Sequence, residues 1–146
     1  MLDALDTILV NLLEQDARQN WDAVAGQLGI SPSSVRRRVR RLIRDGVVSI
    51  AGIPDHSKAG FTVTTVVAIN VDHKKVERVI AILVDRPDIT WLATTTGRFD
   101  IIAHARFASN EKLSDFLDHD LANIDGIINT ETFVCLRLKK WRSIRK

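Results

Sequence analysis

The apolar positions in the N-terminal third of the chain follow a helical period and predict three short helices. Over residues 3–15, apolar side chains recur at intervals of three and four, which indicates an amphipathic helix. Asn20 can cap a second helix that ends at Gly29. A third helix is expected to begin with Ser31 as its N-cap and Pro32 at the first helical position, where the missing N–H costs no hydrogen bond.

The second and third helices have the spacing of a helix-turn-helix. Ala25 lies four residues before Gly29 and ten before Val35. Two helices that cross at a steep angle need a small side chain at the crossing, a glycine in the turn and an apolar side chain between them. Gly46 stands where a left-handed C-cap would close the third helix. These features predict a helix-turn-helix over residues 21–45.

A domain boundary is expected shortly after this motif. Residues 47–50 and 52–53 carry short apolar runs that predict a small two-stranded wing. Residues 54–60 contain proline, glycine and polar side chains, which is typical of a linker. We therefore expect a DNA-binding domain over residues 1–53 and a second domain over residues 61–146.

The second domain alternates between strand and helix patterns. Strands are predicted over residues 61–71, 89–96, 100–107 and 127–138. One helix includes Val76 and stops before Pro87, and a second is capped by Ser109. The order βαββαβ is the ferredoxin-like arrangement of two helices on one face of a four-stranded sheet. The predicted fold class is therefore α+β, an N-terminal (winged) helix-turn-helix domain followed by a ferredoxin-like sandwich domain.

The predicted strands are apolar on both faces. In the first strand Val67 points to one side and Ala68 to the other, and the remaining strands show the same pattern. A sheet face that meets water should be polar, so the second face needs cover. The same sheet of another subunit is the simplest cover and would give an isologous homodimer. His104 and Arg106 share this face, and we expect satisfied polar residues at the interface rather than effector contacts.

The third predicted helix is strongly basic, with six arginines and Asp45 as its only acid. Arginines crowded on one helix repel one another and, apart from Asp45, have no acidic side chain at i,i+4 to pair with, so stability alone does not explain them. A solvated basic face is the alternative to phosphate contact, but within a helix-turn-helix we expect double-stranded DNA as the partner. The predicted DNA-binding residues are Ser31, Ser33, Ser34, Arg36, Arg37, Arg40, Arg41 and Arg44.

Position along this helix predicts different roles for its arginines. The N-terminal turns of the second helix of this motif enter the major groove, where Arg36, Arg37 and Arg40 can reach base edges. Arg41 and Arg44 lie further along and are expected to hold phosphate, which positions the protein without reading sequence.

Arg38 is an exception within this helix. It lies three residues after Val35 and one before Val39, on the side that faces the domain core. A charge there must be paired or must extend its guanidinium to water. Asp6 and Glu14 on the first helix are possible partners, and we favour Asp6.

The charge distribution matters more than the net charge of +3. Residues 31–46 hold six arginines against one acid, and residues 137–146 are basic without any acid. Residues 61–136 hold seven basic and eleven acidic side chains. Only part of the molecule is therefore expected to face a polyanion.

Cysteine usage and the N-terminus predict a cytoplasmic protein. Cys135 is the only cysteine, so no disulfide can form within one chain. The N-terminus lacks the basic region of a signal peptide, and no apolar run approaches the length of a membrane span. The four histidines have no metal-ligand spacing with each other or with Cys135, and neither a metal nor another cofactor is expected.

Three segments resemble a known family when taken together: LDTILVNLLEQDAR (5–18), LGISPSSVRRRVRRLIRDGVV (28–48) and TTGRFDI (95–101). With the linker and the βαββαβ order, the chain resembles the Lrp/AsnC family of bacterial and archaeal regulators from residue 2 to residue 138. The resemblance implies a DNA-binding dimer, often assembled into tetramers or octamers. It also implies a small effector, commonly an amino acid, bound by the second domain between dimers.

The resemblance directs attention to the turn between the second and third strands of the second domain. The predicted effector-binding residues are Thr95, Thr96, Gly97, Arg98 and Asp100. Asp100 would hold the ammonium group of an amino acid, and Arg98 or backbone N–H groups would hold its carboxylate. The alternative is a plain hairpin turn in which Asp100 bonds local N–H groups. Many relatives have an acidic residue after the glycine where this chain has Arg98, so the resemblance does not specify the effector.

An enzyme of the same architecture is the alternative function. Siroheme decarboxylase subunits are similar in overall plan and are expected to place histidine, tyrosine and arginine around a tetrapyrrole. This chain contains no tyrosine, and its arginines concentrate on the predicted DNA-binding helix. We therefore expect a transcription factor rather than an enzyme.

Overall fold

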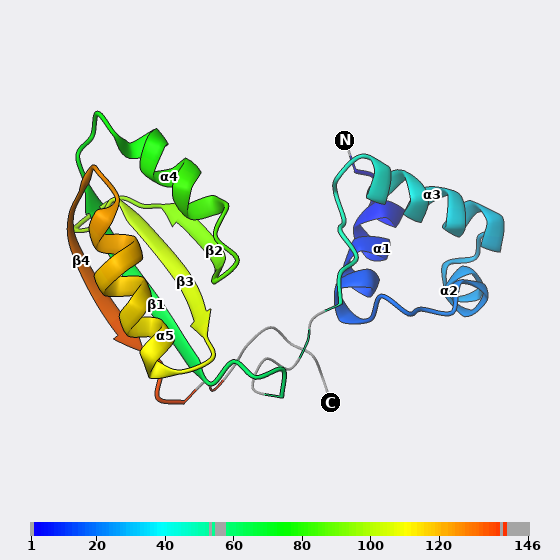
Figure 1. The fold of residues 1–146 in the computed structure, drawn as a ribbon. Coiled ribbons are helices and arrows are strands. Elements are labelled where there is room, and N and C mark those ends of the chain that lie inside the picture. Colours follow the sequence, from blue (N-terminus) through cyan, green and yellow to red (C-terminus); the bar gives the residue numbers. More distant parts are fainter. Residues whose placement is uncertain (1, 53, 55–57, 138, 140–146) are drawn as a thin grey trace. The chain divides into compact units, whose positions relative to one another are not determined.

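The computed structural model describes residues 2–52, 54, 58–137 and 139 (Figure 1). These residues form two compact units, with a boundary between residues 53 and 54 and with Lys139 assigned to the first unit rather than to the predicted second domain. The boundary falls at the start of the predicted linker. Each unit has its own hydrophobic core, as an independent domain requires.

The first unit consists of three helices, α1 (Ala4–Gln15), α2 (Trp21–Leu28) and α3 (Pro32–Arg44). The predicted caps are confirmed, because the Asn20 side chain accepts from the N–H groups of Asp22 and Ala23, and the Ser31 side chain accepts from that of Ser34. Ala25 and Val35 are buried in the core that α2 and α3 share. Gly29 adopts a φ of +65° in the turn between them, a conformation that glycine tolerates best. The predicted helix-turn-helix is therefore confirmed.

The predicted wing is wrong for the described residues 47–52, which contain no strand. The backbone N–H groups of Val47 and Val48 both donate to the Leu42 carbonyl, at 2.9 and 3.2 Å, and so complete the end of α3. A ribbon of two strands this short is also marginal without further pairing. Ile53, the last residue of the predicted wing, lies outside the described residues.

The second unit has the predicted βαββαβ order. Its elements are β1 (Val63–Val71), α4 (Val76–Val84), β2 (Ile89–Thr94), β3 (Ile101–Phe107), α5 (Asn110–Asp115) and β4 (Ile127–Val134). After α5 the helix continues as a π-helical turn, η1 (Phe116–Asp120), and a 3₁₀ turn, η2 (Leu121–Asn123). The strands form one antiparallel sheet in the order β2-β3-β1-β4. The ferredoxin-like α+β arrangement is therefore confirmed.

All four strands are shorter than predicted. β1 begins at Val63 rather than residue 61 and β3 at Ile101 rather than residue 100, whereas β2 and β4 end early. β2 ends at Thr94 because the N–H of Thr95 donates to the Asp100 carbonyl at 2.9 Å and closes the turn. β4 ends at Val134 because it pairs only with β1, which begins at Val63. The N–H of Cys135 still donates to the Thr64 carbonyl at 2.8 Å. Residue 138, the predicted end of this strand, lies outside the described residues.

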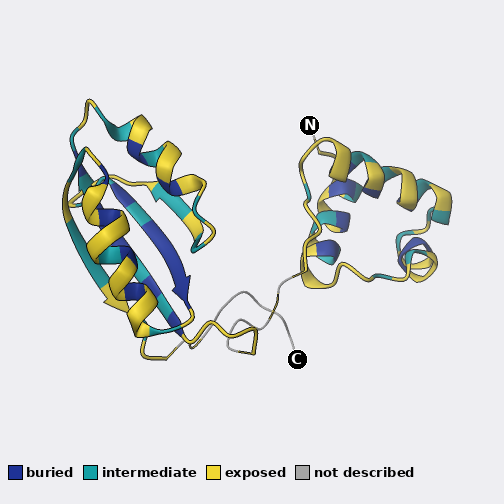
Figure 2. Cartoon of the chain, viewed as in Figure 1, coloured by how far each residue is buried: buried dark blue, intermediate teal, exposed yellow. Residues whose placement is uncertain are grey.

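Both helices pack on one face of the sheet. Alternate side chains of β1, including Val67 and Ile69, form one core with Val79 of α4 and with Leu113 and Phe116 of the second helix. Figure 2 shows that the two central strands carry many of the buried positions of this unit. The helix-covered face of the sheet therefore supplies the core.

The other face, which we call the open sheet face, is apolar as well. Its members include Val66, Ala68, Trp91, Ile102 and Phe133, which the strand register places on the same side. Trp91 is 52% exposed and Phe133 is 49% exposed. The two-faced pattern predicted from the sequence is therefore confirmed.

Two polar residues, His104 and Arg106, lie on the open sheet face and are buried there. The Thr90 hydroxyl lies 2.6 Å from His104 Nδ1 and also donates to the His104 carbonyl at 3.2 Å. Burial lowers the pKa of the Arg106 guanidinium from its ordinary value. His104 is thus held by polar contacts within the unit.

Candidate functional site

Four arginines of α3 are exposed to solvent: Arg36, Arg37, Arg40 and Arg44. Arg36 Nη2 lies 2.8 Å from Asp22 Oδ1, and Arg44 Nε lies 2.9 Å from Asp45 Oδ1. Both pairs are exposed, and such pairs stabilise a protein by only about 0–1 kcal/mol. Within the described part of the chain, Arg37 and Arg40 form no ion pair. These four side chains can therefore bind an anion at little cost to the fold.

The predicted serines begin the same helix. Ser31 Oγ accepts from the N–H of Ser34 at 3.2 Å and lies 3.1 Å from Ser33 Oγ. Ser31 and Ser33 are exposed. The hydroxyl of Ser31 therefore serves as the helix cap, and that of Ser33 lies beside it at the N-terminal turn of α3.

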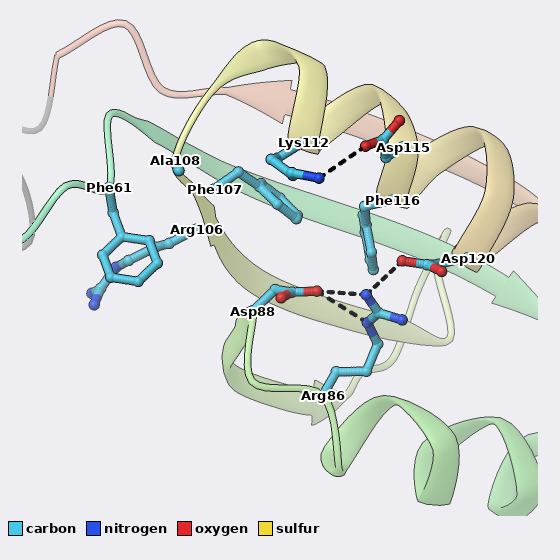
Figure 3. Close-up of a pocket in the computed structure, with 10 residues that line it drawn as sticks. All are labelled: Phe61, Arg86, Asp88, Arg106, Phe107, Ala108, Lys112, Asp115, Phe116 and Asp120. Atoms are coloured by element: carbon cyan, nitrogen blue, oxygen red, sulfur yellow. Dashed lines mark hydrogen bonds and ion pairs between the residues drawn. The ribbon is translucent and has the colours of Figure 1, made fainter.

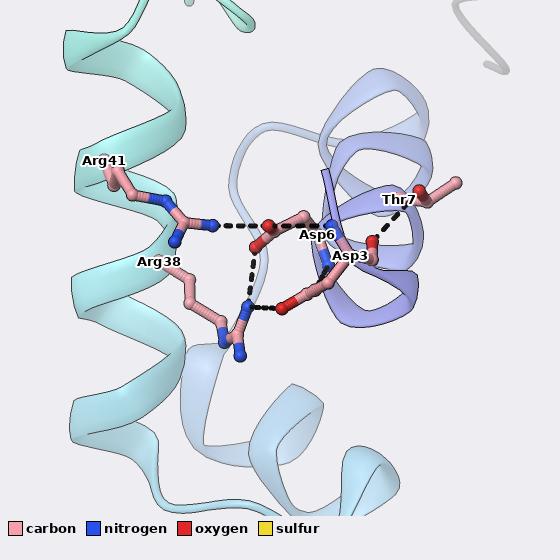
Figure 4. A network of polar contacts seen from close by, with 5 residues as sticks. All are labelled: Asp3, Asp6, Thr7, Arg38 and Arg41. Carbon is pink, nitrogen blue, oxygen red and sulfur yellow. Dashed lines mark hydrogen bonds and ion pairs between the residues drawn. The ribbon is translucent and has the colours of Figure 1, made fainter. Parts of the chain in front are cut away.

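Arg38 and Arg41 point the other way, toward the start of α1 (Figure 4). Arg38 Nη1 lies 2.8 Å from Asp6 Oδ1 and 2.6 Å from Asp3 Oδ2. Arg41 Nη2 donates to the second oxygen of the same Asp6 carboxylate. The predicted pairing of Arg38 with Asp6 is therefore confirmed. Arg41, which is predicted to hold phosphate, also pairs with Asp6, and its side chain is 42% exposed.

Asp6 is a charged group inside the first unit, with an exposed fraction of 1%. Burial alone would raise its pKa, but the hydrogen bond from Arg38, the backbone hydrogen bond from Asp3 and the charge of Arg41 outweigh it. The pKa of Asp6 is therefore lowered from its ordinary value. The backbone N–H of Asp6 donates to Asp3 Oδ1 at 2.8 Å, and this bond, together with that from Arg38, lowers the pKa of Asp3 as well.

The role of Asp3 as a helix cap and as a partner of Arg38 was not predicted from the sequence. Asp3 is the N-cap of α1, and Asp6 at the third helical position completes a capping box with it. The sequence signal for this capping box is a pair of acids, three residues apart, at the start of an apolar helical pattern. The same pair that starts α1 therefore also binds α3.

The predicted effector turn joins β2 to β3 and includes all five predicted residues. Thr95 Oγ1 donates to the Phe99 carbonyl at 2.7 Å, and Gly97 has a φ of +114°. Arg98 extends into solvent, with its guanidinium 5.2 Å from the Phe99 ring and 3.6 Å from Glu131 Oε2. Thr96 is exposed. This turn thus exposes the hydroxyl of Thr96 and the guanidinium of Arg98 to solvent.

Asp100 has a structural contact that the sequence did not indicate. Its Oδ2 accepts from the backbone N–H of Val71 at 2.8 Å, on the neighbouring strand β1 rather than within its own turn. Its own N–H donates to the Ile69 carbonyl at 3.0 Å. Within the described residues, the other carboxylate oxygen accepts no hydrogen bond. Asp100 therefore closes the end of β1 and retains one oxygen for a ligand.

A cavity of about 420 Å³ lies at the opposite end of β3 from this turn (Figure 3). Arg86 lines this cavity, and its Nη2 atom lies 2.6 Å from Asp88 Oδ2 and 2.6 Å from Asp120 Oδ2. Its guanidinium lies 4.9 Å from the centre of the Phe116 ring. These contacts join the segment before β2 to the η1 turn. The charge of Arg86, which lines the cavity, is thus paired within the fold.

The described residues include no group of histidine, cysteine and acidic side chains that could hold a metal ion. Among the same residues, no helix has the length and apolar character needed to cross a membrane.

Comparisons with known proteins cover both units. Residues 2–43 match the model of the AsnC-type helix-turn-helix domain, and residues 64–143 match that of the Lrp/AsnC ligand binding domain. An uncharacterised HTH-type transcriptional regulator of Pyrococcus abyssi is 33% identical over 141 residues, which is 96% of this chain and 89% of the relative. The chain therefore belongs to the Lrp/AsnC family.

Two solved structures show the same fold over the whole chain. E. coli AsnC is 27% identical with a TM-score of 0.87, covering 99% of this chain and 98% of the other. A feast or famine regulatory protein from M. tuberculosis, solved with L-methionine, is 27% identical with a TM-score of 0.86, covering 100% and 98%. The families and relatives are transcriptional regulators, so this chain is a DNA-binding transcriptional regulator and not the enzyme considered as the alternative.

Proposed function

We propose that this regulator acts as a homodimer that reads a specific DNA site with α3 and binds an amino acid at the β2–β3 turn. The observation that carries the DNA part is the exposed face of α3. Arg37 and Arg40 have no partner among the described residues, and Arg36 and Arg44 have only exposed, weak ones. A helix-turn-helix presents this face to the major groove.

The four exposed arginines form two groups, one that can contact base edges and one that can contact phosphates. Arg37 and Arg40 are one helical turn apart, and each can grip guanine O6 and N7, a contact worth about 1–3 kcal/mol of discrimination. Arg36 and Arg44 can exchange their carboxylate partners for phosphate, and Ser33 can donate to phosphate beside them. Arg41 is left out of this set because the buried carboxylate of Asp6 holds it.

The dimer is supported by the open sheet face. Trp91 and Phe133 are about half exposed on this face, and exposed apolar patches often mark protein–protein interaction sites. The same face of a second copy is self-complementary and would cover it. Tetramers or octamers, which the family resemblance implies, would build on that dimer.

The effector site is supported by the chemistry of the turn. Asp100 offers one carboxylate oxygen for an ammonium group, and Arg98 and the exposed N–H groups offer donors for a carboxylate. The related M. tuberculosis protein, solved with L-methionine, supports an amino acid as the ligand class. Binding would alter DNA occupancy if the amino acid prefers one assembly state over another.

Selection of binding sites from a randomised duplex pool tests the function as a whole. The purified full chain should enrich a pseudo-palindromic site, with half-sites about one helical turn or a multiple of it apart, because a two-fold dimer presents two copies of α3. Absence of any enriched site would contradict the proposal.

A further inference from the structure

The contacts of Asp6 bear on the number of arginines of α3 that can bind DNA phosphates. The helix carries six arginines, yet two of them end on one buried carboxylate of α1 (Figure 4). Asp6 is 1% exposed, whereas the carboxylates that pair with Arg36 and Arg44 are exposed. The two classes of ion pair therefore differ in how easily a phosphate can replace the carboxylate.

An exposed pair is readily exchanged, because both charges are already hydrated and screened by salt. The Asp6 carboxylate is different, since it has lost its water and depends on the two guanidiniums for compensation. Moving Arg38 or Arg41 to a DNA phosphate would leave a buried charge short of a partner. Arg38 is held more firmly still, because Asp3 binds the same Nη1 at 2.6 Å.

We propose that Asp6 is a specificity-determining residue that never touches DNA: it withdraws Arg38 and Arg41 from the surface of α3 that meets phosphate. This inference rests on the proposed DNA-binding role of α3. Base-reading contacts from Arg37 and Arg40 are left intact, while the number of sequence-independent phosphate contacts is kept low. Sequence-independent binding is governed by that number, so Asp6 raises the ratio of specific to random binding.

The direct test is Asp6→Asn in the full chain, which keeps the shape of the side chain and removes its charge. Binding to random duplex and to the selected duplex is measured by fluorescence anisotropy over a range of salt concentrations. Each additional phosphate bound should steepen the slope of log K against log salt by about 0.9, so one or two freed arginines should steepen it by about 0.9–1.8. Random-duplex affinity should rise by about tenfold per additional phosphate at low salt, and the specific-to-random ratio should fall.

The matched control is Asp22→Asn, which removes the exposed partner of Arg36. That arginine is already exchangeable, so the slope should stay at the wild-type value. A purely structural role for Asp6 would lower both affinities together and would not steepen the slope. A folded Asp6→Asn protein, checked by circular dichroism, with an unchanged slope would overturn the inference.

Arg41→Gln provides a second variant if Asp6→Asn fails to fold, because Arg38 still pairs with Asp6 in it. If Asp6 withdraws Arg41 from DNA, this variant should keep the wild-type salt slope on random duplex. A slope shallower by about 0.9 would mean that Arg41 holds phosphate and would overturn the inference. Wild-type protein that binds no DNA at all would instead refute the proposed function of α3.

Discussion

Single residues of α3 show how one helix can serve two surfaces. Arg38 and Arg41 bind Asp6 of α1, with side chains 23% and 42% exposed, whereas Arg37 and Arg40 face solvent. Spacing alone predicted the inward position of Arg38, because it lies between two buried valines. Spacing could not predict the contact of Arg41 with Asp6, because a long flexible side chain at the edge of a face can turn either way.

Replacing Arg38 should affect stability more than sequence preference. Arg38→Ala removes two charge-assisted hydrogen bonds and leaves Asp6 with Arg41 and the Asp3 N–H, so we expect a lower free energy of unfolding and a lower melting temperature. Thermal unfolding followed by circular dichroism measures the change. Arg36→Ala, which removes only the exposed pair with Asp22, is the control and should cost no more than about 1 kcal/mol. A fully stable Arg38→Ala protein would show that the pairing is dispensable.

The same cluster should make stability depend on acid. The pKa of Asp6 is lowered in the folded protein from its ordinary value of 3.8, so the unfolded chain binds the proton more tightly. Its contribution is therefore present above pH 3.8 and is lost as the pH falls through the lower folded value. Unfolding by denaturant, measured between about pH 5 and pH 2, should show a shallower pH dependence for Asp6→Asn than for wild type. Equal pH dependence in both proteins would argue against an ionised Asp6.

At the scale of elements, periodicity and caps predicted most of the architecture. Asn20 and Ser31 mark helix starts through side-chain geometry that acts within a few residues, so sequence alone locates them. The wing failed because Val47 and Val48 donate to the end of α3, a choice between local partners that apolar patterning does not encode. The bond from the Val71 N–H to Asp100 was also unpredictable, because it joins two residues that are 29 positions apart in the sequence.

The β2–β3 turn permits a test that separates the fold from ligand binding. Asp100→Asn keeps an oxygen that can accept from the Val71 N–H but removes the charge that would attract an ammonium group. In a thermal-shift screen of amino acids, wild type should gain stability with at least one of them. Asp100→Asn should have a similar melting temperature without ligand and a much smaller gain with it. Equal gains in both proteins would exclude Asp100 as the partner of the ammonium group.

At the scale of the whole molecule, the open sheet face predicts association. Light scattering of wild type at micromolar concentration should give at least a dimer mass, because the face is apolar and half exposed at Trp91 and Phe133. Trp91→Asp should shift the mass toward the monomer, since a charge there would be desolvated at the interface. Ile82→Asp, an exposed site on α4 on the other side of the sheet, is the control. A folded wild-type monomer would refute the sheet-to-sheet dimer.

Reading of DNA sequence by the exposed face of α3 is tested by comparing two affinities in the same variants. Arg37→Ala and Arg40→Ala are titrated with the selected duplex and with a random duplex at one salt concentration. Loss of a bidentate base contact should weaken binding to the selected duplex by about 1–3 kcal/mol more than binding to the random one. Equal losses on both duplexes would mean that these arginines hold only phosphate and that this face of α3 does not read DNA sequence.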